Sequence, residues 1–234
     1  MSRPLRALAV LALAALAACA AGPPAQPPAG AATPARGQSP AQLLAVVQRD
    51  ADGLDQTTDA AARSRLLTEA AAAARQCMAQ FPDAGACPYA QAQVQGLSAR
   101  AKPVEAPGLL KQMVASLARA EAREPDLDHA GPARLSAIVL LRAPPWPLGP
   151  GDVDTALSAA QRAVKLDPAY PPNLITLGAV QAKAVGAATA RTTFGQARQA
   201  VQAWNGAGSE PAAEVAAERG KWLAQIEQGL HDLQ

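Results

Sequence analysis

Few side chains in this chain could perform catalysis. Its 234 residues include two histidines, and one of them, His129, stands in the stretch PDLDHAGP beside Asp126 and Asp128. Two carboxylates and an imidazole at this spacing could hold a metal ion. The same acids at the start of a helix would instead cap its free backbone N–H groups, which is the interpretation we favour.

Sequence motifs for catalysis and cofactor binding are missing as well. The chain contains no HExxH, GxSxG, Walker or GxGxxG motif. The glycines of GPGD, residues 149–152, are not followed by the lysine and the serine or threonine of a phosphate-binding loop. We therefore expect no enzyme activity, no cofactor and no metal site.

The N-terminus has the pattern of an exported lipoprotein. Arg3 and Arg6 precede an apolar run over residues 7–18, which is too short for a permanent membrane span and is typical of a secretory signal. The run ends in LAAC, which resembles the bacterial lipobox, in which the cysteine (here Cys19) is acylated and the chain is cut before it. An ordinary secretory signal cut nearby is the alternative. Ala20 stands where an aspartate would favour the inner membrane, so we expect an outer-membrane lipoprotein facing the periplasm.

Removal of this signal would leave a neutral chain. The loss of Arg3 and Arg6 reduces 21 basic residues to 19, against 19 acidic residues. A neutral chain without a basic run has no electrostatic footprint for nucleic acid. We also expect no polybasic attraction to membranes.

The two remaining cysteines, Cys77 and Cys87, form an even pair in an exported chain. An oxidising compartment makes a disulfide the default expectation for such a pair. A metal site would need further ligands, and no histidine lies nearby. The intervening CMAQFPDAGAC has the pattern of a helix end, a turn and a helix start, so the bond would join two helices.

Composition divides the rest of the chain into a tether and one folded domain. Cys19 and the Ala-, Pro- and Gly-rich residues 20–39 are typical of an extended tether. Residues 40–234 are long enough for one domain or a short repeat array. Aromatic residues make up only 3% of the chain, β-branched alternation is absent, and alanine-rich helical patterns run throughout. The predicted fold class is all-α.

A repeated pattern indicates an array of helical hairpins. Pro82, Pro125 and Pro168 are 43 residues apart each time. Small or apolar residues stand 12, 8 and 5 positions before each proline, a spacing that shares one helical face. A shift of the last set by 34 residues, the period of the tetratricopeptide repeat, gives a fourth set. The four sets are Ala70, Ala74 and Cys77; Met113, Leu117 and Ala120; Ala156, Ala160 and Ala163; and Ala190, Phe194 and Ala197.

An alanine-rich bundle would not produce this common phase, so we predict a tetratricopeptide-like α-solenoid. The expected helices cover residues 40–50, 57–80, 86–100, 107–123, 130–142, 152–166, 172–184 and 188–204. A last helix over 210–230 lacks the repeat phase and suits a terminal cap. Its apolar stripe is Trp222, Leu223, Ile226 and Leu230, with Trp204 packed beneath it.

The stretch RAPPWPLGPGD, residues 142–152, interrupts this helical sequence. Its four prolines exclude helix and predict a stiff, extended loop, which Asp152 ends as the N-cap of the next helix. Trp146 in this loop could be a plug packed against its own repeat, which we favour, or a rim that meets a ligand or partner.

The sequence around this loop resembles the TatT family of tetratricopeptide lipoproteins associated with periplasmic TRAP transporters. The resemblance covers residues 130–180, about a quarter of the mature chain. Two departures, Ala130 in place of a glycine and Pro145 in place of a glycine, leave the path of the loop open. The matching positions are Gly131, Pro132, Arg134, Pro144, Trp146, Pro147, Gly149, Gly151, Asp152, Ala156, Ala163, Pro168, Tyr170, Pro171, Pro172 and Asn173.

The resemblance implies a helical array tethered to the outer membrane. A homo-oligomer, specifically a trimer, is one of the oligomeric states compatible with this resemblance. Its implied partner is a periplasmic solute-binding protein, and its implied ligand is small and apolar. An adaptor for envelope or secretion assembly that binds peptides is the alternative. We expect the interacting residues to be Arg142, Trp146, Tyr170 and Asn173, clustered at adjacent helix ends, although Tyr170 and Asn173 could equally fix the turn between repeats.

Overall fold

The computed structural model of the chain describes residues 37–206 and 211–234. The signal segment, Cys19 and most of the predicted tether lie outside these ranges. The all-α class is confirmed, because the described residues contain helices and no strand. The helices are α1 (Pro40–Gln56), α2 (Ala60–Gln80), α3 (Ala86–Ala101), α4 (Ala106–Arg123), α5 (Leu127–Arg142), α6 (Val153–Leu166), α7 (Pro171–Ala184), α8 (Ala187–Ala203) and α9 (Ala212–His231).

Side-chain caps set several of these boundaries. Ser39 and Gln42 form a reciprocal capping box at the start of α1. The Asp59 carboxylate accepts a hydrogen bond of 2.7 Å from the N–H of Ala62, so α2 begins at Ala60 and not at the predicted residue 57. The predicted first helix, over 40–50, continues to Gln56. Asp152 caps α6 as predicted, accepting from the N–H of Thr155 at 2.8 Å.

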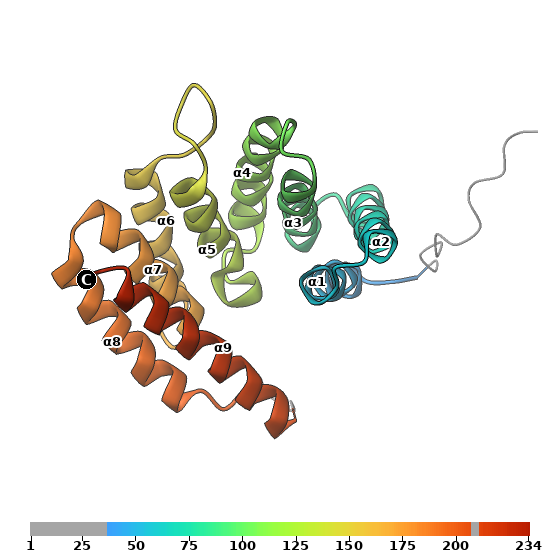
Figure 1. Ribbon diagram of the computed structural model, residues 1–234. Coiled ribbons are helices and arrows are strands. Elements are labelled where there is room, and N and C mark those ends of the chain that lie inside the picture. The colour runs from blue at the N-terminus through green and yellow to red at the C-terminus, as the bar shows by residue number, and fades with distance from the viewer. Residues whose placement is uncertain (1–36, 207–210) are drawn as a thin grey trace, which may run out of the picture. The chain divides into compact units, whose positions relative to one another are not determined.

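Consecutive helices pack in pairs, as Figure 1 shows: α1 with α2, α3 with α4, α5 with α6, and α7 with α8. The first helices of neighbouring pairs also pack together, α1 on α3 and α5 on α7. The first helices α3 and α5 make little direct contact, which distinguishes this junction from the other two.

Two edges of this array recur below. The pair-turn edge consists of the loops that join the two helices within a pair, residues 57–59, 102–105, 143–152 and 185–186. The link edge consists of the segments that join one pair to the next, residues 81–85, 124–126 and 167–170. Every first helix runs from the link edge to the pair-turn edge.

The aligned small residues form the core between the helices of each pair. All twelve members of the four sets, from Ala70 to Ala197, are buried. Most are alanines, so the second helices approach their neighbours closely, and Phe194 is the one aromatic among them. The common phase seen in the sequence therefore marks the packed face of each second helix.

The last helix, α9, covers the end of the array by packing on α7 and α8. Trp222 and Ile226 are buried there, and Leu223 and Leu230 pack at the margin of the same cluster. The predicted capping stripe is thus the face that α9 buries. Trp204 contacts Trp222 with ring centroids 5.5 Å apart.

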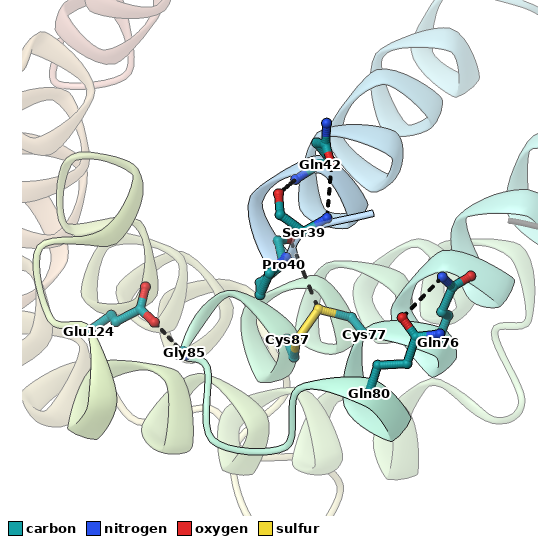
Figure 2. The surroundings of a disulfide bond; sticks show 9 residues. All are labelled: Ser39, Pro40, Gln42, Gln76, Cys77, Gln80, Gly85, Cys87 and Glu124. Carbon is teal, nitrogen blue, oxygen red and sulfur yellow. Dashed lines mark hydrogen bonds between the residues drawn. A yellow bond between two sulfur atoms is a disulfide. The ribbon is translucent and has the colours of Figure 1, made fainter. Parts of the chain in front are cut away.

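A disulfide joins Cys77 of α2 to Cys87 of α3, with Cα atoms 5.1 Å apart (Figure 2). Both cysteines are completely buried. The Cys77 sulfur lies 4.0 Å from the carbonyl oxygen of Pro40, so the bond sits beside the first turn of α1. The Glu124 carboxylate accepts a hydrogen bond of 2.7 Å from the N–H of Gly85 and links the α2–α3 turn to the end of α4.

Among the described helices, none combines the length and the apolar character needed to cross a bilayer.

Candidate binding site

An apolar groove of about 560 Å³ lies between α3 and α5, where the two first helices diverge. Leu110 and Met113 of α4 form its floor. Its lining extends along α3 from Tyr89 to Arg100, roughly 16 Å of helix. A volume of this size accommodates a small molecule. Its walls are largely aliphatic and include Gly96, Leu97, Leu135, Ile138 and Val139.

Two arginines border the groove where it reaches the pair-turn edge. Arg100 of α3 donates a hydrogen bond of 2.7 Å to Asp55 of α1. Arg142, the last residue of α5, is exposed and has no hydrogen-bonded or ion-paired partner among the described residues. The groove therefore combines apolar walls with a free positive charge at one end.

Arg142 also borders a second pocket, of about 620 Å³, between α5, α7 and α9. Ile138 lines both pockets as well, so these two residues form the ridge between them. The second pocket is more polar, with Gln225, Gln228 and Asp232 of α9 among its lining residues.

Tyr89 closes the groove at the link edge. The Tyr89 side chain is buried, and its hydroxyl donates a hydrogen bond of 2.6 Å to Asp128 at the start of α5. Burial, first of all, and the nearby Asp128 carboxylate raise the pKa of this phenol well above its usual range. Gly131 makes the contact possible, because a Cβ there would lie 2.3 Å from the Tyr89 oxygen.

The start of α5 has an unusual backbone. Asp128, His129 and Ala130 all have left-handed φ values, of 51°, 55° and 61°. Such a run is costly for residues with a side chain and persists only when surrounding contacts hold it. Glycine adopts this conformation freely, whereas Ala130 must be held in it by its surroundings.

Arg134 and Asn173 hold this left-handed turn. The Arg134 guanidinium donates to the carbonyl oxygens of Asp128 and His129, and to the Asp128 carboxylate at 3.2 Å. The Asn173 amide lies within hydrogen-bond distance of the carbonyls of His129, Ala163 and Asp167. These two side chains satisfy carbonyls that the distorted helix start leaves free.

The capping role predicted for Asp126 and Asp128 is wrong. Asp126 occupies the N-cap position but makes no side-chain cap, and the carboxylate of Asp128 turns to Tyr89 and Arg134. His129 Nδ1 lies 2.7 Å from the carboxylate of Asp167. Within residues 37–206 and 211–234, no group of acidic, histidine and cysteine side chains is arranged to hold a metal ion.

Four aromatic rings pack together beside this turn. Tyr170 stacks on His129 with centroids 4.2 Å apart and meets Trp204 and Trp222 edge to face. The Arg134 guanidinium carbon lies 5.0 Å from the centre of the Tyr170 ring. Burial raises the pKa of Tyr170 to about 12.

The four residues expected to interact with a partner do not lie together. Tyr170 and Asn173 belong to the link edge, and Arg142 and Trp146 belong to the pair-turn edge at the far end of α5. Asn173 is completely buried, so it cannot touch a partner. The expectation failed because it placed the start of α7 beside the end of α5, whereas these helices run the same way. The alternative, in which Tyr170 and Asn173 fix a turn, matches their contacts.

The favoured interpretation of Trp146 as a plug is also wrong. Its side chain is 83% exposed, and Leu148 beside it is 69% exposed. Figure 1 shows the loop standing out from the ends of α5 and α6. The loop satisfies its own backbone, with the N–H of Gly151 bonded to Pro144 at 2.9 Å, and does not need the indole to hold it.

Sequence reasoning missed the groove and the role of Tyr89. The groove results from the divergence of α3 and α5, and no local pattern encodes an interhelical distance. The apolar residues of α3 and α5 that face it have the spacing of ordinary core positions. One signal was available, since Gly96 places a residue without a side chain in the middle of a helix.

Comparison with known proteins leaves this site to be interpreted from its own residues. No protein-family model matches the chain, and no curated protein matches it.

Proposed function

We propose that this protein is a lipid-anchored periplasmic scaffold of the tetratricopeptide type, accessory to solute capture, that binds a small amphipathic ligand in the α3–α5 groove. The groove carries the proposal: apolar walls over about 560 Å³ favour a hydrocarbon chain, and Arg142 at one end favours a carboxylate. The paired helices, the 34-residue shift and the TatT resemblance support the repeat type, and LAAC at 16–19 supports the anchor.

Filling the groove tests the ligand. Gly96→Leu places a side chain into the cavity, where only the flexible end of Met113, 3.0 Å from the new Cβ, must move. We expect a fluorescent long-chain carboxylate to bind the unsubstituted chain and to bind Gly96→Leu at least tenfold more weakly. Gly220→Leu is the matched control, because exposed Gly220 on α9 has open space around it. Equal affinities for all three chains would refute the ligand proposal.

The charge of Arg142 is tested separately. Arg142→Gln removes the positive charge and keeps a polar side chain, and the apolar walls remain intact. If Arg142 holds a carboxylate, the substitution should weaken binding of the acid and leave its methyl ester unaffected. A parallel loss for both probes would mean that Arg142 acts by shape and not by charge.

The partner of the scaffold is tested in the native envelope. A photo-crosslinker at position 138 or 142, on the ridge between the two pockets, should capture a periplasmic solute-binding protein. The adaptor alternative draws on the same ridge, because two adjoining pockets could hold an extended peptide. Links to envelope-assembly proteins alone would favour that alternative.

A further inference from the structure

The loop over residues 143–152 presents almost no backbone donor to water. Pro144, Pro145, Pro147 and Pro150 have no N–H group. The other N–H groups donate within the chain at 2.8–3.2 Å, from Ala143, Leu148, Gly149, Gly151 and Asp152. Among the described residues of this loop, Trp146 alone has an N–H without a protein acceptor.

The same loop carries the largest exposed apolar side chains of the array. Pro145 pairs with Gly151, so Trp146 and Leu148 lie beyond this bridge, at the tip of the loop. The loop is compact at its base, since a Cβ on Gly151 would lie 2.1 Å from the carbonyl oxygen of Ala143. A preformed loop can insert its tip without a large cost in conformational entropy.

Exposed apolar side chains continue along the pair-turn edge. Val104 in the α3–α4 loop is 96% exposed, and Val185 in the α7–α8 loop is 55% exposed. In the part of the chain that the structure describes, the remaining large exposed apolar residue is Leu166, at the link-edge end of α6. The large exposed apolar side chains are therefore concentrated on the pair-turn edge.

We infer that the pair-turn edge contacts a lipid surface, with the Trp146–Leu148 tip inserted at the boundary between headgroups and acyl chains. A loop with a single free backbone N–H, that of Trp146, suits the boundary region, because an apolar medium penalises each unpaired N–H and headgroups can still accept from this one. Tryptophan is favoured at this depth, since its ring is apolar and its N–H can still reach water or headgroups.

The distribution of the side chains favours lipid over a protein partner. Val104, the Trp146–Leu148 tip and Val185 belong to three successive turns and do not form one continuous patch. A protein partner would need a matching cavity for each, whereas a lipid surface accepts dispersed side chains independently. Charges within two residues of these turns nearly balance, so insertion should depend little on salt. The charged residues are Arg100, Lys102, Arg142 and Lys183 against Glu105, Asp152 and Asp154.

Quenching by brominated lipid tests the insertion. The full chain is reconstituted into vesicles of phosphatidylethanolamine and phosphatidylglycerol, with and without bromine on the acyl chains. We expect brominated lipid to quench tryptophan fluorescence in the unsubstituted chain and to quench it far less in Trp146→Phe, because Trp204 and Trp222 lie in the aromatic cluster. Equal quenching of the two chains would overturn the inference.

Partitioning without the anchor gives a second readout. In a chain carrying Cys19→Ser, the double substitution Trp146→Ala and Leu148→Ala should lower the vesicle partition coefficient roughly tenfold. The control Leu166→Ala, on the opposite edge, should leave it unchanged. An unchanged partition coefficient for the double substitution would also overturn the inference. So would a photo-crosslinker at position 146 that captures one protein and no lipid. Sedimentation of the unsubstituted chain with vesicles reports the anchor separately.

Discussion

Arg134 of α5 donates a hydrogen bond of 3.1 Å to the side-chain oxygen of Asn173 on α7. The two side chains that stabilise the left-handed turn at residues 128–130 are therefore also hydrogen-bonded to each other. The junction between the third and fourth helix pairs is therefore polar at its link-edge end, whereas the core clusters on either side of it are apolar. The Asn173 amide is the part of this network most deeply enclosed.

Asn173→Ala should destabilise the protein by about 2–4 kcal/mol, because it leaves buried carbonyls without their donor and removes one acceptor of the Arg134 guanidinium. Urea unfolding followed by circular dichroism measures the change. Asn205→Ala, at an exposed amide, is the matched control and should change the free energy of unfolding by less than about 0.5 kcal/mol. Equal effects would mean that the Asn173 network adds nothing to stability.

Glycine-to-alanine substitutions should have opposite signs at two positions in helices. Gly131→Ala drives a methyl group into the Tyr89 hydroxyl and should cost about 2 kcal/mol or more. Gly220→Ala meets open space and should stabilise α9 by about 0.5–1 kcal/mol. Thermal unfolding of both variants measures the two changes. An undiminished stability of Gly131→Ala would show that Tyr89 can shift away from Asp128 without cost.

Trp146→Ala should leave the free energy of unfolding within about 0.5 kcal/mol of the unsubstituted value, since the indole is exposed. Trp222→Ala should cost about 3–5 kcal/mol, because that indole is buried between α9 and the helices that α9 covers. Chemical denaturation compares the two. A large loss of stability in Trp146→Ala would support the interpretation of Trp146 as a plug packed against its own repeat.

The folded protein should lose stability in alkali between about pH 10 and pH 12. Tyr170 has a pKa of about 12 in the folded state, against about 10 when unfolded. The unfolded chain therefore releases its proton first, and the contribution of this phenol, complete below pH 10, is lost as the pH rises. Tyr170→Phe should reduce the slope of the unfolding free energy against pH by the equivalent of up to one proton, and it keeps the ring stack on His129. An unchanged slope would contradict the assignment.

Loss of the Cys77–Cys87 disulfide should cost about 2–3 kcal/mol, because the bond restricts a short loop in the unfolded chain. The double substitution Cys77→Ala and Cys87→Ala, compared with the unsubstituted chain in oxidising buffer, measures the loss. Under full reduction the two chains should unfold at closer urea concentrations. A persistent difference would mean that packing of the sulfurs outweighs the cross-link.

The features that the sequence predicted correctly depend on periodicity within one helix or on a single cap. The phase of Ala156, Ala160 and Ala163 identified a packed face, and Asp152 marked a helix start, because both signals act within one helix. The terminal position of α9 also followed from its departure from the repeat phase.

The errors concern relations between helices. Asp128 looked like a cap because nothing in its neighbourhood shows that Tyr89, 39 residues earlier, lies within 2.6 Å. Arg142 and Asn173 were grouped because both lie at helix ends, although those ends are on opposite edges. Prolines explain the stiffness of the Trp146 loop but do not tell which way its tip points.

The divergence of α3 and α5 has a mechanical consequence. Two polar contacts between the second and third helix pairs lie at the link edge. Tyr89 donates a hydrogen bond to Asp128, and the Arg162 guanidinium forms an ion pair of 2.7 Å with Glu121. At the pair-turn edge the groove separates Arg100 from Arg142. A rotation of α5 away from α3 about the link edge would therefore widen the mouth of the groove and keep the Tyr89–Asp128 contact at its inner end.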